Sequence, residues 1–211
     1  MNDRINDMQH KRLLIFDCDG VLFDSHGANI AFFNRCLARG GYPLLEEALE
    51  EKVAYLSTRQ LIYDLVADTR EAERLFRVSQ ETDYSPFIPG LTPLFDFEEV
   101  LGRLSSRHHL AVATNRGRSI ERLTAHFGLD RWFDYFASTL DAEPKPHPEM
   151  LLKCMARCNV TAGETVYFGD ADSDREAAER AGIDFVRVGD GRHGITSVAD
   201  LLLDIPGAEK N

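Results

Sequence analysis

Two aspartates near the start of the chain, Asp17 and Asp19, have the spacing of a pair that acts on a cation or on a reacting group. They follow the apolar run Leu13–Phe16, which has the composition of a buried β-strand. Side chains at positions i and i+2 of a strand point to the same side, so the two carboxylates crowd each other. Such crowding is unfavourable unless a cation or a reaction uses the pair. Ligands of open parallel sheets bind beyond the carboxyl ends of the strands, and this pair lies at such an end.

Three later segments carry polar residues that can bind phosphate or a metal ion. Thr114 and Asn115 end an apolar run and lead into a glycine turn, where a hydroxyl and backbone N–H groups can hold phosphate oxygens. Lys145 stands between two prolines just before a predicted helix, and the prolines restrict the backbone around it. Asp170 and Asp174 follow another apolar run. Because the carboxyl ends of parallel strands meet at one edge of a sheet, we expect these residues to gather there.

Carboxylates, a hydroxyl and a lysine gathered in this way form a set suited to phosphoryl transfer. A carboxylate attacks phosphorus only if the negative charge of its target is offset, and Mg²⁺ held by other carboxylates, together with a lysine, supplies that offset. Mg²⁺ takes oxygen ligands and bridges protein to phosphate, so it is the expected cofactor. A calcium loop is the alternative for the acids after residue 169. That loop needs glycine at its sixth position and glutamate at its twelfth, where this chain has Arg175 and Ala181.

The elements that must position these residues alternate between strand and helix. We expect strands at residues 13–16, 110–114, 135–138, 165–168 and 184–188, and helices at residues 92–104, 118–127, 148–158 and 174–181. This order predicts an α/β fold in which a Rossmann-like parallel sheet is covered by helices on both faces.

The alternation is interrupted after the first strand by a section with helical patterns only. Helices are expected at residues 28–39, 44–55 and 70–80, with a further one capped by Ser57. The Pro- and Gly-containing segment 85–90 is typical of a linker. The simplest organisation is an α/β core formed by residues 1–24 and 87–211, interrupted by a helical insert formed by residues 25–86.

Composition limits the partners that the chain can have. The chain has 211 residues, of which 44% are hydrophobic and 28% charged, as in ordinary globular proteins. A net charge of −11 argues against nucleic acid as a partner. No apolar segment approaches the ~20 residues that a membrane span needs, and the first residues lack the apolar core of a signal peptide. We therefore expect a cytoplasmic protein with no membrane partner. A monomer is the default expectation for its oligomeric state.

In combination, these motifs resemble those of the haloacid dehalogenase superfamily. The resemblance rests on residues 16–25, on Thr114-Asn115, on Lys145-Pro146, and on Gly169-Asp170 with Asp174, all in the order of that family. It covers nearly the whole chain. More narrowly, the chain resembles the branch that contains phosphoglycolate phosphatase and β-phosphoglucomutase and carries a helical cap.

The resemblance implies a role for each catalytic residue. Asp17 is expected to be the nucleophile and to become an aspartyl phosphate. Asp19 is expected to protonate the leaving oxygen and then to activate water. Thr114 and the N–H of Asn115 are expected to bind the transferring phosphoryl group, and Lys145 to offset charge on the phosphate and on Asp17.

The resemblance also implies a metal site and a reaction. Asp17, the backbone carbonyl of Asp19, Asp170 and Asp174 are expected to hold Mg²⁺, directly or through water. The implied activity is Mg²⁺-dependent hydrolysis of a small phosphate monoester, such as phosphoglycolate or a sugar phosphate, so the expected partner is a small phosphorylated metabolite. Two alternatives remain open: a phosphohexose mutase that uses the same core chemistry, and a catalytically silent binding or regulatory protein on the same fold.

Overall fold

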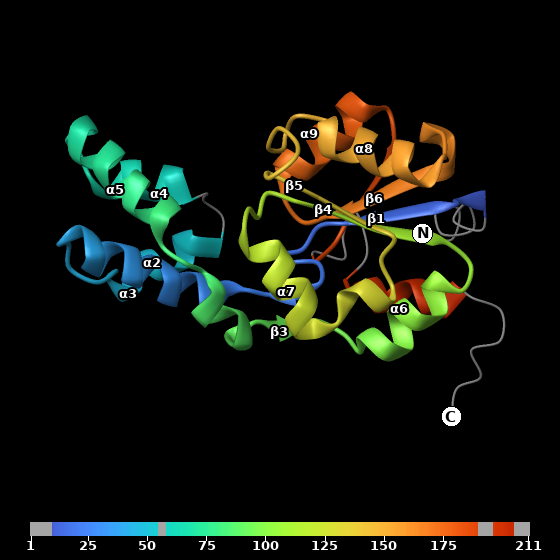
Figure 1. Ribbon diagram of the computed structural model, residues 1–211, viewed down its shortest axis with the longest axis horizontal. Helices are drawn as coiled ribbons and strands as arrows, with labels where there is room; N and C mark the ends of the chain where they lie inside the picture. The colour runs from blue at the N-terminus through green and yellow to red at the C-terminus, as the bar shows by residue number, and fades with distance from the viewer. Residues whose placement is uncertain (1–9, 55–57, 190–195, 205–211) are drawn as a thin grey trace. The chain divides into compact units, whose positions relative to one another are not determined.

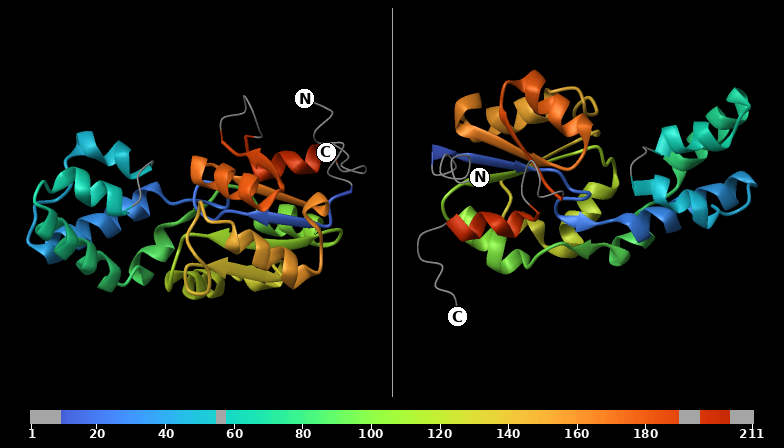
Figure 2. Two further views of the ribbon diagram at one scale, coloured as in Figure 1. Left: turned by 90° about the horizontal axis from the view of Figure 1, so that it is seen from above. Right: turned by 180° about the vertical axis from the view of Figure 1, so that it is seen from behind.

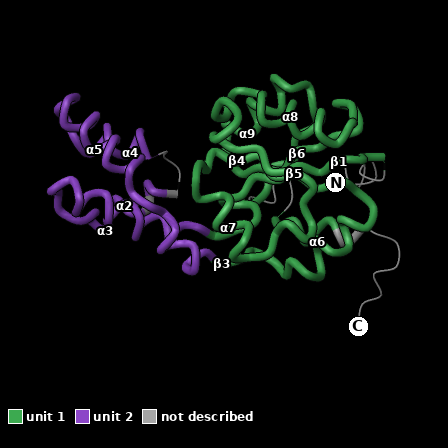
Figure 3. Tube along the Cα trace, in the orientation of Figure 1, with its two compact units in different colours: residues 1–24, 92–211 green, residues 25–91 purple. Residues whose placement is uncertain are grey.

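The chain divides into two compact units in the computed structural model, which describes residues 10–54, 58–189 and 196–204. Unit 1 comprises residues 1–24 and 92–211, and unit 2 comprises residues 25–91 (Figure 3). Unit 1 contains β1 (Leu13–Phe16), β2 (Phe23–Asp24), β3 (Thr92–Pro93), α6 (Phe97–Ser105), β4 (His109–Thr114), α7 (Ser119–Phe127), η4 (Leu129–Arg131), β5 (Tyr135–Ser138), α8 (Glu149–Cys158), η5 (Ala162–Glu164), β6 (Thr165–Gly169), α9 (Asp172–Ala181), β7 (Asp184–Arg187) and η6 (Val198–Asp204).

Unit 1 is built around a five-stranded sheet with the strand order β5-β4-β1-β6-β7. Every neighbouring pair in this sheet is parallel. All five strands predicted from the sequence are present, and the predicted α/β class is confirmed. Phe16 of β1 is level with Val112 of β4 and with Phe168 of β6. The residues that follow these three strands therefore emerge at one edge of the sheet.

Helices cover both faces of the sheet (Figures 1 and 2). One face packs against α8 and α9, and Leu13 and Ile15 of β1 are buried there. Leu14 and Phe16 alternate with them and are buried on the opposite face, where α6 and α7 lie. The ring of Phe16 stacks on that of Phe168 with centroids 5.0 Å apart. The central strand is thus apolar on both sides, as expected for a strand covered by helices on both faces.

The segment after residue 91 differs from its prediction. Instead of one helix over residues 92–104, Thr92–Pro93 pairs antiparallel with Phe23–Asp24, and α6 begins only at Phe97. Asp96 caps α6, its side chain accepting a hydrogen bond from the N–H of Glu99 at 3.0 Å. An aspartate one residue before an apolar helical pattern is a stronger start signal than the threonine at position 92.

Unit 2 has its own helical core. It contains α2 (His26–Gly40), α3 (Glu47–Glu50), η2 (Glu51–Ala54), α4 (Thr58–Leu65), α5 (Thr69–Glu81) and η3 (Ser85–Gly90). Phe33, Leu61, Ile62 and Leu75 are buried together in this core. Gly41 caps the carboxyl end of α2, and its φ of 81° lies in the left-handed region that favours glycine.

Two predictions for unit 2 were wrong in detail. The helix expected over residues 44–55 is broken into the short α3 and η2. Glutamates at i and i+4, such as Glu46 and Glu50, repel each other and disfavour one continuous helix. Residues 87–91, assigned to the core from the sequence, belong to unit 2, because η3 packs on α2 with the ring of Phe87 5.8 Å from that of Phe32. The expected cap residue Ser57 lies outside the described residues.

Among the described residues, no helix is both long enough and apolar enough to cross a membrane.

Candidate active site

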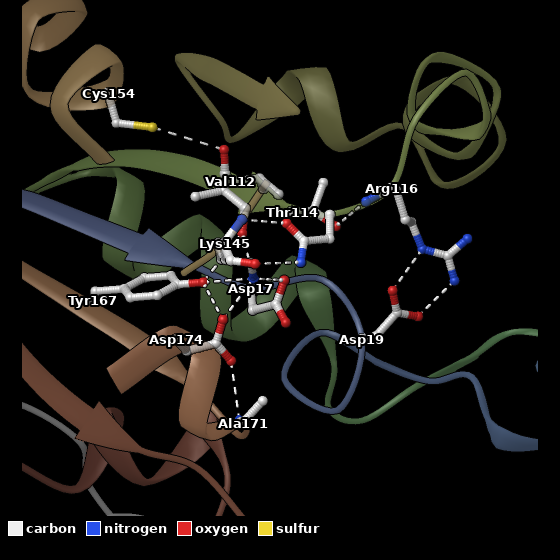
Figure 4. Close-up of polar contacts among 12 residues, drawn as sticks. Asp17, Asp19, Val112, Thr114, Arg116, Lys145, Cys154, Tyr167, Ala171 and Asp174 are labelled. Atoms are coloured by element: carbon white, nitrogen blue, oxygen red, sulfur yellow. Dashed lines mark hydrogen bonds and ion pairs between the residues drawn. The ribbon is translucent and has the colours of Figure 1, made fainter. Parts of the chain in front are cut away.

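The acidic residues predicted from the sequence converge at the carboxyl edge of the sheet (Figure 4). Asp17 follows β1, Asp170 follows β6, and Asp174 lies in the first turn of α9. One carboxylate oxygen from each lies within 4.8 Å of the other two. The donors are all oxygens, which is the chemistry that Mg²⁺ prefers. The residues present therefore fit a magnesium ion.

Lys145 is the buried cation of this cluster. Its Nζ lies 2.8 Å from Oδ1 of Asp17 and 2.6 Å from Oδ1 of Asp174. It also donates hydrogen bonds to the hydroxyl of Tyr167 at 2.8 Å and to the carbonyl of Ala113 at 3.1 Å. These four oxygens more than satisfy the three N–H donors of the ammonium group, so its burial leaves no donor without an acceptor. Lys145 thus connects β1, β4, β6 and α9 at one point.

The loop that carries Lys145 is held in place by Asn115. The side-chain oxygen of Asn115 accepts a hydrogen bond from the N–H of Lys145 at 2.8 Å, and its amide group donates to the carbonyl of Lys145 at 3.3 Å. Thr114, directly before it, is buried, and its hydroxyl oxygen accepts from the N–H of Arg116 at 3.1 Å. The end of β4 and the turn after it therefore position both the hydroxyl of Thr114 and the loop of Lys145.

Burial and charge act strongly on the ionisable groups of this site. Burial raises the pKa of Asp17 well above its usual value, Lys145 opposes this effect, and Asp174 adds to it. Burial alone would lower the pKa of Lys145, but Asp17 and Asp174 together raise it. Burial, with Asp174 next, raises the pKa of Asp170 to about 6. A divalent cation beside these carboxylates would favour their ionised forms.

The remaining acidic residues of the two motifs have other partners. The carboxylate of Asp19 pairs with the guanidinium of Arg116. Asp172, an acid of the second motif, is exposed and pairs with Arg187. The backbone beside Asp19 nevertheless lies against Asp170, since a Cβ added to Gly20 would come within 2.1 Å of Oδ2 of Asp170. Gly20 also has a φ of 72°, so glycine is required there for two reasons.

Comparison with known proteins assigns this architecture to a family. The model of the family described as haloacid dehalogenase-like hydrolase matches residues 14–188. The chain belongs to this family. It is therefore a hydrolase of the haloacid dehalogenase type, as the resemblance in sequence predicted.

Relatives of the hydrolase cover most of its length. Fructose-1-phosphate phosphatase YqaB of Escherichia coli is 30% identical over 182 residues, which is 83% of this chain and 95% of that protein. Phosphoglycolate phosphatase of Xanthomonas campestris is 30% identical over 210 residues, covering 94% of this chain and 95% of that protein. Among solved structures, a haloacid dehalogenase-superfamily hydrolase of Geobacter sulfurreducens has a TM-score of 0.71 and 32% identity, covering 85% of this chain and 87% of that one.

Three contacts of the hydrolase's site were not predicted from its sequence. They are the side chain of Asn115 on the Lys145 loop, the pair of Arg116 with Asp19, and Tyr167 inside the cluster. Tyr167 had a detectable signal, because a tyrosine in the middle of a buried strand needs a partner for its hydroxyl. The other two depend on distances between separate loops, which the sequence does not contain.

Removal of the Tyr167 hydroxyl tests how the cluster is supported. That hydroxyl donates to Oδ1 of Asp174 at 2.8 Å and accepts from Lys145. We expect Tyr167→Phe to lower the free energy of unfolding by about 1–3 kcal/mol, because two buried charged groups lose a partner. Urea denaturation measures the change. Tyr135→Phe is the control, since its hydroxyl contacts only the exposed Asp141 among the described residues, and an equal loss in both variants would contradict the assigned role.

Proposed function

We propose that this hydrolase is a Mg²⁺-dependent phosphatase that acts on a small phosphate monoester through an aspartyl phosphate on Asp17. The observation that carries the proposal is the buried contact of Lys145 with Asp17 and Asp174, next to the oxygen cluster that includes Asp170. A buried carboxylate beside a fixed cation and a set of oxygen donors is the arrangement that a nucleophile needs when its target is an anion.

The first step of the proposed reaction transfers the phosphoryl group to the protein. An oxygen of Asp17 attacks phosphorus while the bond from phosphorus to the leaving oxygen breaks. Asp19 gives its proton to that leaving oxygen. The hydroxyl of Thr114 and the N–H of Asn115 hold oxygens of the transferring group, and Lys145 offsets the charge that Asp17 and the phosphate bring together.

The second step releases inorganic phosphate. Asp19, now a carboxylate, accepts a proton from a water molecule. The oxygen of that water forms a bond to phosphorus as the bond between phosphorus and Asp17 breaks. Both aspartates then return to their starting states, so the cycle is balanced.

Mg²⁺ would be held by the carboxylates of Asp17, Asp170 and Asp174 and by the backbone carbonyl of Asp19. When bound, it would neutralise charge on the phosphate and keep the clustered carboxylates ionised. Both oxygens of Asp174 already accept hydrogen bonds, from Tyr167, Lys145 and the N–H of Ala171. Asp174 is therefore suited to act through water, with Asp17 and Asp170 as the direct carboxylate ligands.

The substrate class rests on the relatives and on unit 2. The two relatives above are named for fructose 1-phosphate and phosphoglycolate, both small phosphate monoesters. The core residues explain the reaction but not the leaving group. We assign leaving-group selection to the helical residues 25–91 as the proposed cap. The cytoplasmic location and the monomeric state stay predictions.

Hydrolysis of p-nitrophenyl phosphate tests the proposed function. We expect turnover with Mg²⁺, none with EDTA, and recovery when Mg²⁺ is restored. Turnover that is indifferent to EDTA would contradict a metal-dependent phosphatase, and no turnover of any phosphate ester would favour the silent binding protein. Incubation with a bisphosphorylated hexose separates the mutase alternative, because a mutase returns an isomeric sugar phosphate whereas a phosphatase releases phosphate.

The affinity for Mg²⁺ is expected to fall in acid. Burial and Asp174 raise the pKa of Asp170 to about 6, so the metal-free site holds a proton below that pH and Mg²⁺ must displace it. One such proton weakens binding by up to about tenfold for each pH unit below about 6.

The stability of the metal-free protein is expected to change in the opposite direction. Because the folded state binds this proton more tightly than the unfolded chain, the free energy of unfolding should decrease as the pH rises from about 4 to about 6.

Titration calorimetry with Mg²⁺ at about pH 5 and about pH 7.5 measures this effect. Asp170→Asn is the matched variant, in which the pH dependence over this range should be reduced and the affinity should be low at both values. An affinity of the unaltered protein that is the same at both pH values would contradict the prediction.

A further inference from the structure

Asp19 is held by both of its carboxylate oxygens. Nε of Arg116 donates to Oδ2 at 2.8 Å, and Nη2 of the same guanidinium donates to Oδ1 at 2.6 Å. The side chain of Arg116 is only 7% exposed, whereas that of Asp19 is partly exposed. A two-point contact between a planar guanidinium and a carboxylate fixes the plane of the carboxylate as well as its distance. Figure 4 shows this pair beside the cluster of Asp17, Lys145 and Asp174.

The guanidinium extends from a backbone that is itself anchored. The N–H of Arg116 donates to the hydroxyl of Thr114 at 3.1 Å, and its carbonyl accepts from the N–H and the hydroxyl of Thr139 at 3.3 and 3.2 Å. Thr139 follows β5, and Thr114 ends β4, so two strands of the sheet fix this turn. The guanidinium of Arg116 therefore contacts Asp19 from a backbone that is fixed in place.

Asp19 needs such a partner because the proton transfers proposed for it depend on the orientation of its carboxyl group. Proton transfer requires the carboxyl oxygen to lie within hydrogen-bond reach of the leaving oxygen, and an error of about 1 Å is costly. Asp19 lies in the turn between β1 and β2, and its side chain has two rotatable bonds that a contact must fix. Lys145 is directed at Asp17 and Asp174 instead. The two-point contact from Arg116 restricts the orientation of the Asp19 carboxylate.

We propose that Arg116 is a positioning residue that orients the carboxylate of Asp19 for both proton transfers, without itself binding the transferred phosphoryl group. This inference rests on the proposed function. When Asp19 is protonated, one oxygen keeps its hydrogen bond from the guanidinium while the other carries the proton that passes to the leaving oxygen. In the second step the same carboxylate takes a proton from water, and the guanidinium keeps all of its own protons throughout.

The dependence of the rate on the leaving group tests the proposal. An alkyl phosphate such as β-glycerol phosphate needs a proton on its leaving oxygen. Dinitrophenyl phosphate instead releases dinitrophenolate, a stable anion that needs no proton to leave. We expect Arg116→Ala to lower kcat/KM for the alkyl ester by about 100-fold and to change that for the dinitrophenyl ester by less than about threefold. The parameter kcat/KM is chosen because it reports only the steps up to the phosphorylation of Asp17.

Two further variants separate a positioning role from loss of charge or of folding. Arg118→Ala removes a neighbouring exposed cation and should leave both rates unchanged. Arg116→Lys keeps the charge but cannot form the two-point contact, so the alkyl ester should recover only in part. Melting temperatures confirm that each variant is folded.

A double-mutant cycle with Asp19→Asn distinguishes failure of this inference from failure of the proposed function. If Arg116 acts through Asp19, adding Arg116→Ala to Asp19→Asn should change the ratio of alkyl to dinitrophenyl rates no further. If Asp19→Asn itself leaves that ratio unchanged, the assigned role of Asp19 fails and the inference fails with it. If Asp19→Asn lowers the ratio but Arg116→Ala raises it or leaves it unchanged, only the inference is overturned. An equal rise in KM for both esters in Arg116→Ala would mean that Arg116 binds phosphate, and would also overturn it.

Discussion

Replacement of Lys145 by methionine is expected to abolish turnover and to destabilise the metal-free protein by about 3–5 kcal/mol. The Nζ of Lys145 is buried between Asp17 and Asp174, and methionine fills much of its volume without its charge. Two buried carboxylates would then face each other without a cation, and removing one partner of a buried ion pair leaves the other uncompensated. We expect kcat to fall by at least about 10³-fold, since the same charge serves the transition state.

Mg²⁺ should partly restore the stability of Lys145→Met, because a bound cation offsets the same carboxylates. Urea denaturation with and without Mg²⁺ measures both effects. Lys153→Met is the matched control. The side chain of Lys153 on α8 is partly exposed and pairs with that of Glu149, and a solvent-accessible pair of this kind contributes at most about 1 kcal/mol. If the two variants were equally stable without metal, the buried charge balance described for the site would be wrong.

Replacement of Asp17 by asparagine is expected to lower kcat by at least about 10⁴-fold while leaving the fold intact, as for other residues that form the covalent bond. An amide does not replace a carboxylate as a nucleophile towards phosphorus. The fold should tolerate the change, because burial raises the pKa of Asp17 and a neutral group removes the cost of the buried charge. Asp174 remains as a partner of Lys145.

Rates with a good aryl phosphate, together with melting curves, measure the effect of Asp17→Asn. Asp130→Asn, an exposed aspartate of η4, is the control and should retain full turnover. If Asp17→Asn melted at a much lower temperature, unfolding would explain its loss of rate. Asp17→Glu, which keeps a carboxylate at this position, is therefore measured as a second variant. Turnover in Asp17→Asn near that of Asp130→Asn would refute the assigned nucleophile.

The sheet and the acidic cluster could be predicted because both follow from local patterns. Each strand is a short apolar run, and the order of strands and helices requires a parallel sheet. Parallel strands end at the same edge, so the residues after β1, β4 and β6 had to meet there. Asp17, Asp170 and Asp174 accordingly lie within one cluster.

The contacts that organise the site could not be predicted because they join loops that are distant in sequence. Arg116 contacts Asp19 across 97 positions, and Asn115 contacts Lys145 across 30. The periodic pattern of apolar residues does not indicate which distant loops contact each other. The start of α6 was predicted too early for another reason. The apolar pattern of the helix continues back in the sequence to residue 92, but Asp96 is the better N-cap, so the helix begins at Phe97. Helical pattern alone does not locate a helix end.

Chemical trapping of the covalent intermediate tests the central claim most directly. Asp19→Asn should slow hydrolysis of the acyl phosphate, so this variant is mixed with dinitrophenyl phosphate and Mg²⁺, quenched, and reduced with borohydride. Peptide mass spectrometry then identifies which aspartate has been converted to homoserine. The account predicts conversion at Asp17, which EDTA prevents. Conversion at another residue, or release of dinitrophenol in the first turnover with Asp17 unmodified, would contradict it.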